Sequence, residues 1–213
     1  MTLIATIPAS DGIIIATDSV LAAGGVRDRT QKIVRLTNKI CWAGTGELPL
    51  IQRFAQQLAA FEDSPQTLKE LLPSLTNILR STVRELLAYD YRTDVYANNP
   101  NAIAQLHRAD FLFAEWSNGV PYSLHLNTFG SPQWFSDRPF FVGPGDVFAG
   151  WLHQKYKGAT LTTKSGVSLG YRIVEEAIDT GWYGLGGSPD VWQITDAGVK
   201  QLAESDARSM KDR

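Results

Sequence analysis

The sequence is poor in the residues that several common kinds of site require. Among its 213 residues there is one cysteine, Cys41, so no internal disulfide can form, and this pattern fits a reducing compartment. Its histidines, His107, His125 and His153, are scattered without the spacing of metal ligands, so we expect no metal site. The sequence does not imply an organic cofactor either. The net charge is −2, and the lack of a basic excess argues against a nucleic-acid or membrane-surface binder.

Long apolar runs and signs of modular construction are also missing. No stretch has the length of a membrane span or the pattern of a signal peptide, so the sequence predicts a soluble, cytoplasmic protein. We find no internal repeat, low-complexity segment or linker. A chain of 213 residues can bury one sizeable core, so we expect a single domain over residues 1–213. The charged tail after about residue 203 is expected to be frayed.

What the sequence does contain is a concentration of reactive groups in its first 46 residues. Two apolar runs, 3–7 and 13–17, flank Asp11-Gly12 and predict a β-hairpin. Further strands are predicted to begin near residue 32 and to cover 40–43. The residues of interest lie at the ends of these strands: Thr2, Asp18, Lys32, Gly44 and Gly46.

These residue types can together perform acyl transfer. If Met1 is removed, Thr2 carries an α-amine and a hydroxyl on one residue, and an amine with a pKa near ~8 can take the hydroxyl proton. A nearby Lys32 would lower the pKa of that amine and stabilise the developing alkoxide, while Asp18 would keep the lysine charged and oriented. Gly44, at a strand-to-helix turn, could offer its backbone N–H to an oxyanion.

The rest of the chain alternates between strands and helices. Helical spacing of apolar residues predicts helices over residues 50–61, 64–86, 146–156 and 165–179, the second capped by Ser64-Pro65 and kinked or delayed by Pro73. Further strands are predicted over residues 110–117, 122–128, 140–142 and 191–195, with loops over 89–104 and 131–138. This order predicts an α+β fold, a four-layer α/β/β/α sandwich of two antiparallel sheets flanked by helices.

Three patterns in the opening segment, taken in order, carry a resemblance to a known family. They are the DG-apolar-A-x-D-S run at 11–19, the K-I-x-R-L-x-N strand at 32–38 and the A-G-x-G turn at 43–46. In this order the chain resembles the start of a proteasome β-type subunit, a member of the N-terminal-nucleophile (Ntn) hydrolases. It is most similar to the bacterial heat-shock-locus V peptidase and the betaproteobacterial proteasome homologue. The resemblance extends over essentially the whole chain and implies the same four-layer sandwich.

The resemblance implies a role for each of these residues. It makes Thr2 the nucleophile, Asp18 and Lys32 its activating pair, Gly44 the oxyanion glycine and Asp179 a support for the amine. It also implies that substrate contacts come from Val20, Trp42 and Gly46. The chain departs from the family at Pro144 and Leu185, where a serine is common, and neither side chain can replace a hydroxyl unless another group, such as that of Ser188 or Thr180, substitutes.

The implied activity is that of a threonine-type endopeptidase. Its subunits would form stacked homo-oligomeric rings, cleave peptides or unfolded proteins in an enclosed chamber, and could work with an AAA+ unfoldase. Two alternatives stay open: a catalytically inactive ring subunit of the same fold, and an Ntn amidohydrolase acting on a small amide. Residual activity on labelled peptides separates the first from the main hypothesis, and the size of the assembly separates the second.

Overall fold

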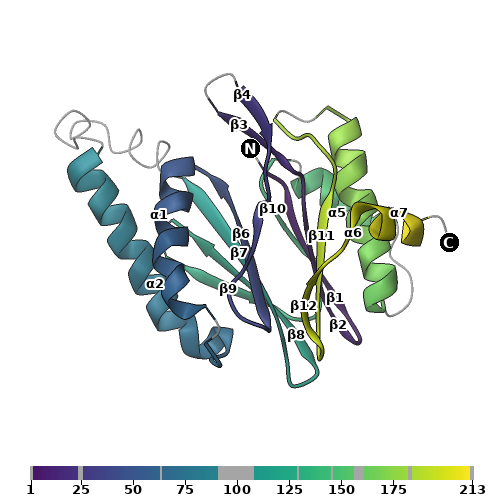
Figure 1. Cartoon of the computed structure of the whole chain (residues 1–213), viewed down its shortest axis with the longest axis horizontal. Helices are drawn as coiled ribbons and strands as arrows, with labels where there is room; N and C mark the ends of the chain where they lie inside the picture. Colours follow the sequence, from purple (N-terminus) through teal and green to yellow (C-terminus); the bar gives the residue numbers. More distant parts are fainter. Residues whose placement is uncertain are drawn as a thin grey trace.

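In the described ranges the chain has an α+β fold made of two five-stranded antiparallel sheets, a two-stranded hairpin and five α-helices (Figure 1). Figure 1 is a computed structural model that describes residues 2–23, 26–62, 64–90, 108–128, 130–144, 146–155, 161–181 and 184–211. Met1, His107 and most of the predicted loop at 89–104 lie outside these residues. No helix in the described ranges is long and apolar enough to cross a membrane.

The first sheet contains the N-terminal hairpin. Its strands, in spatial order, are β10 (Phe140–Val142), β1 (Ile4–Ala9), β2 (Gly12–Thr17), β11 (Asp190–Thr195) and β12 (Gly198–Gln201). The predicted hairpin is confirmed, with Ala9 paired to Gly12 and Ile4 to Thr17. The chain therefore enters and leaves this hairpin at the same end of the sheet.

The second sheet is a run of strands adjacent in sequence. Its order is β5 (Ile33–Arg35), β6 (Ile40–Gly46), β7 (Ala109–Ser117), β8 (Val120–Asn127) and β9 (Pro132–Phe135). Asn118 and Gly119 form the turn between β7 and β8, and both residues have positive φ. The prediction of a loop over 131–138 is wrong, because Pro132 to Phe135 pair with β8 as an edge strand. An edge position tolerates Pro132, which has no N–H to donate.

A small hairpin that the sequence analysis missed follows β2. Its strands β3 (Val20–Ala23) and β4 (Val26–Arg29) pair with each other and project from the end of the first sheet where the N-terminus lies (Figure 1). The VRDR sequence of β4 lacks the alternation of apolar and polar residues that marks a half-buried strand.

Three apolar clusters hold the elements together. Ile4, Ile13 and Ile15 of the first sheet pack in one cluster between the two sheets with Ile33 and Leu112 of the second sheet. The alternate residues of the hairpin point the other way, toward α5 (Asp146–Lys155) and α6 (Thr163–Asp179). The third cluster lies between the second sheet and α1 (Leu48–Leu58) and α2 (Leu68–Glu85). Each sheet thus has helices on its outer side (Figure 1).

The predicted start of the second helix was wrong. The second helix begins at Leu68 rather than at Ser64-Pro65, because Thr67 caps it in a reciprocal capping box with Glu70. Pro73 lies inside this helix.

The prediction of a frayed tail is wrong for the described residues 204–211. They form α7 (Glu204–Lys211), whose Ala207 is buried in the same cluster as α6, while Arg29 forms an ion pair with Glu204.

Candidate active site

The predicted site residues meet because several strands end at one edge of the two sheets. In the first sheet the pairing of Ile4 with both Thr17 and Val142 leaves Thr2, Asp18 and Gly143 just beyond the last pairs. In the second sheet the last β5–β6 pair is Ile33 with Ala43, so Lys32 and Gly44 follow it on neighbouring strands. Register therefore places these residues at one end of each sheet, and the packing of the two sheets brings Lys32 to Asp18.

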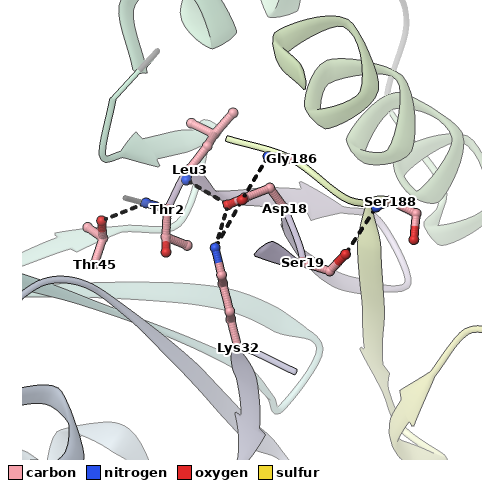
Figure 2. Close-up of polar contacts among 8 residues, drawn as sticks. All are labelled: Thr2, Leu3, Asp18, Ser19, Lys32, Thr45, Gly186 and Ser188. Atoms are coloured by element: carbon pink, nitrogen blue, oxygen red, sulfur yellow. Dashed lines mark hydrogen bonds and ion pairs between the residues drawn. The ribbon is translucent and has the colours of Figure 1, made fainter. Parts of the chain in front are cut away.

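Asp18 is the centre of this group. Its carboxylate is fully buried and accepts hydrogen bonds from Lys32 Nζ at 2.9 Å to Oδ1 and 3.0 Å to Oδ2. Backbone N–H groups complete its shell, with Leu3 N at 3.2 Å from Oδ1 and Gly186 N at 3.3 Å from Oδ2 (Figure 2). Because the same Oδ1 serves Leu3 and Lys32, the ammonium lies beside the Thr2–Leu3 peptide.

Burial governs the protonation of this ion pair. It raises the pKa of the Asp18 carboxyl, and the positive charge and hydrogen bonds of Lys32 oppose that shift. Burial likewise lowers the pKa of the Lys32 ammonium, against the opposing effect of Asp18. The Lys32 side chain is only 7 % exposed. Lys32 is thus a buried cation that gives up its proton more readily than a lysine in water.

Thr2 lies next to this pair and is held by two further contacts. It is nearly buried, and its N–H donates to Thr45 Oγ1 at 3.3 Å. Gly143, with φ +101°, approaches so closely that a Cβ there would lie 1.9 Å from the Thr2 carbonyl oxygen. Only glycine fits this position, because it has the required φ and no side chain. Figure 2 shows Thr2, Asp18 and Lys32 gathered at the start of β1.

The segment after α6 is tied to Asp18 by its backbone. Ser19 N donates to Gly186 O at 3.2 Å, and Ser188 N donates to Ser19 Oγ at 3.0 Å. Gly187 has φ +76°, and a Cβ there would lie 2.4 Å from Ser19 Oγ. These contacts fix the loop that donates to Asp18.

The three predicted substrate-binding residues lie in different parts of the structure. Val20 packs against Gly186, and Gly46 ends β6 with φ +118°. Trp42 is buried among Phe54, Phe111 and Phe113. It also lines a cavity of about 130 Å³ at the edge formed by β5 and α1.

Asp179 is not brought into the cluster. It is exposed at the end of α6, and its side chain makes no hydrogen bond or ion pair with any residue that the structure describes. Leu185 occupies one of the two positions where a serine is common in the resembled family, and it is buried in the cluster around α6.

The hydroxyls considered as substitutes for the family serines are engaged elsewhere. Thr180 Oγ1 donates to Ala177 O at 2.8 Å, and Ser188 Oγ accepts from Arg29. Thr45, Ser19 and Gly143 were missed by the sequence analysis. Thr45 could have been found, since it lies between two glycines already assigned to the site.

Within the described part of the chain no three potential metal-ligating side chains come together. The comparisons with known proteins give no independent identification: no family model matches this chain, and no curated protein matches its sequence.

Proposed function

We propose that this protein is a threonine peptidase subunit of the proteasome type, with Thr2 as nucleophile once it is the N-terminal residue. The observation that carries the proposal is the buried Lys32–Asp18 pair at the start of β1, directly beside Thr2. A buried lysine held by a carboxylate is expensive to maintain and is an arrangement that active sites use to shift pKa values.

The fold supports the same proposal. Two facing sheets with helices on both outer sides agree with the four-layer sandwich expected of an Ntn hydrolase, and we propose that the chain has this fold. Fold alone does not determine activity, so the activity has to be inferred from the residues of the site.

The reaction begins with attack of Thr2 Oγ1 on the carbonyl carbon of a peptide bond. The Thr2 α-amine takes the hydroxyl proton, and the positive charge of Lys32 stabilises the oxygen as it loses that proton. Asp18 keeps Lys32 oriented through its two short contacts. The backbone N–H of Gly44 is proposed to bind the oxyanion of the tetrahedral intermediate.

Collapse of this intermediate breaks the C–N bond, and the departing amine receives the proton held by the α-amine. The acyl group remains on Thr2 as an ester. Water then attacks the ester carbonyl, again with the α-amine as base, which releases the acid and restores the hydroxyl. No cofactor is needed for these steps.

The substrate is proposed to be an extended peptide beside Gly44 and Gly46. β6 continues past its last pair with β5, so these glycines lie beyond the β5 partner strand. Strand alternation places Trp42 on the same face as Gly44, and the cavity that Trp42 lines with Val34 could receive a small apolar side chain. Stacked homo-oligomeric rings and an AAA+ unfoldase partner remain proposals that follow from the resemblance.

Intact-mass measurement with a peptide epoxyketone tests the nucleophile. This reagent forms a ring with both the hydroxyl and the free amine of an N-terminal threonine. We expect one adduct per chain on protein that begins at Thr2, retention of the adduct in Thr2→Ser and none in Thr2→Ala. An adduct on Thr2→Ala, or none on wild-type protein that begins at Thr2, would contradict the proposal.

A second candidate is an inactive ring subunit of the same fold. It is favoured by the exposure of Asp179 and by the apolar burial of Leu185, where the resemblance calls for a hydroxyl. Ring-sized particles in light scattering, combined with the absence of an epoxyketone adduct, would support this candidate. A small particle that hydrolyses simple amides would instead support the amidohydrolase.

A further inference from the structure

We propose that the Thr45 hydroxyl holds and orients the α-amine of Thr2, in place of the serines that the chain lacks at positions 144 and 185. This inference rests on the proposed function, because it assigns a partner to the catalytic amine. Among the described residues, Thr45 supplies the side-chain oxygen that accepts a hydrogen bond from the Thr2 nitrogen, at 3.3 Å. Thr45 is 5 % exposed, so water is a poor competitor for this contact.

The alternation of β6 explains why this hydroxyl points at Thr2. Cys41 and Ala43 belong to the cluster between the two sheets, so Thr45, two residues further, faces the same space. Ile4 belongs to that cluster as well, which places Thr2 on the same face of β1. The two threonines therefore face each other from opposite sheets.

Gly143 makes room for the contact. A Cβ at this position would lie 3.4 Å from Thr45 Oγ1 and would overlap the Thr2 carbonyl oxygen. Pro144 follows directly, at the position where the resemblance places a serine. The amine is thus supported from the second sheet, through Thr45, and not by a side chain at position 144.

The contact has a definite chemical effect on an N-terminal Thr2. Thr45 Oγ1 accepts one N–H of the amine, which fixes the direction of the nitrogen lone pair relative to the Thr2 hydroxyl. Because an oxygen acceptor favours the charged ammonium, the contact also raises the pKa of the amine and opposes the effect of Lys32. Loss of the hydroxyl should therefore lower the pKa of the base and leave the amine less well oriented.

The test is the pH dependence of kcat/KM for a fluorogenic peptide, measured on Thr45→Val and Thr45→Ser. We expect Thr45→Val to lose about 10- to 100-fold in kcat/KM, the factor that goes with one hydrogen bond to a charged group. The acidic limb of the pH–rate profile of Thr45→Val should move to lower pH by about one unit. Thr45→Ser should keep kcat/KM within a few-fold of wild type, with the acidic limb at the wild-type pH. A structural role would not move the limb.

Thr82→Val is the matched control, because it makes the same change at a buried threonine of α2, away from the site. If melting shows that Thr45→Val is unfolded, Thr45→Ala and Thr45→Ser provide a pair that differs by one oxygen atom. The role of Thr45 is overturned if wild-type protein is active and Thr45→Val has the same kcat/KM and the same acidic limb. It is also overturned if Thr45→Ala and Thr45→Ser have equal rates and equal limbs. Either result leaves the proposed function intact. A wild type that begins at Thr2 but forms no epoxyketone adduct overturns both.

Discussion

Replacement of Asp18 by asparagine gives the sharpest test of how the site is held together. The carboxylate is fully buried and neutralises a lysine whose side chain is 7 % exposed. It also accepts two backbone N–H groups, from Leu3 and Gly186. An asparagine keeps one acceptor oxygen, but its NH₂ group faces donors, and Lys32 loses the negative charge that compensates its own.

The size of the effect follows from the burial of both partners. Removing one member of a buried ion pair costs about 3–5 kcal/mol, since the remaining charge stays out of water. For a chain of this length that corresponds to a fall in melting temperature of roughly 6–20 °C. The double variant Asp18→Asn/Lys32→Met removes the stranded charge, so it should be more stable than Asp18→Asn by about 1–3 kcal/mol.

Thermal and denaturant unfolding at one fixed protein concentration provide the measurement, because assembly would make the melting temperature depend on concentration. Asp137→Asn is the matched control: this exposed aspartate makes no ion pair or hydrogen bond with the described residues, so its replacement should change stability by no more than about 0.5 kcal/mol. If Asp18→Asn costs less than about 1 kcal/mol, or if the double variant is less stable than the single one, the electrostatic account of the site is refuted.

Three further predictions concern single positions. Gly143→Ala should lower stability by about 1–3 kcal/mol in denaturant unfolding and abolish the epoxyketone adduct, because the added Cβ would displace the Thr2 carbonyl. A Gly143→Ala variant that forms the adduct as fully as wild type would contradict this prediction. Thr82→Val should stabilise the protein by up to about 1 kcal/mol in the same assay, since the buried Thr82 hydroxyl has no hydrogen-bond partner among the described residues. A loss of stability would show that this hydroxyl does form a hydrogen bond. The Glu115 carboxyl accepts a hydrogen bond from Leu68 N–H, and burial raises the pKa of this carboxyl above the ordinary glutamate value of 4.5. The contribution of Glu115 to the stability of the folded state therefore falls as the pH rises above 4.5. The stability of Glu115→Gln relative to wild type should therefore increase from about pH 4 to about pH 7, and a flat or falling difference would disprove the assignment.

Local signals accounted for the part of the site that lies within one hairpin. Asp11-Gly12 predicts the turn, and a tight turn determines the register, so Leu3 must lie opposite the residue after Thr17. The contact between Leu3 N and Asp18 is a consequence of that register. The class of the fold was predictable for the same reason, because its helices and most of its strands have strong periodicity.

Contacts between sheets were not predictable in this way. Lys32 belongs to the second sheet and Asp18 to the first, and the unpredicted β3–β4 hairpin separates them in sequence. The Thr2–Thr45 contact depends on how the two sheets face each other, which no local pattern encodes. The end of α6 was predicted correctly, but not that Asp179 would be exposed there. The tail helix α7 was missed because it is mostly polar and is held by tertiary contacts.

One of the two departures from the pattern of the resembled family, at position 185, has a physical explanation in this site. Leu185 anchors the segment after α6 in the apolar cluster, and the following Gly186 offers both its N–H and its carbonyl to Asp18 and Ser19. A backbone group needs no particular side chain, so this segment can support Asp18 without a hydroxyl at position 185. What this segment does need is a particular backbone conformation. Gly187 must keep φ +76° and lack a Cβ for the loop to reach Ser19. Substitutions at Gly187 should therefore impair the site more than Leu185→Met, which preserves the apolar anchor.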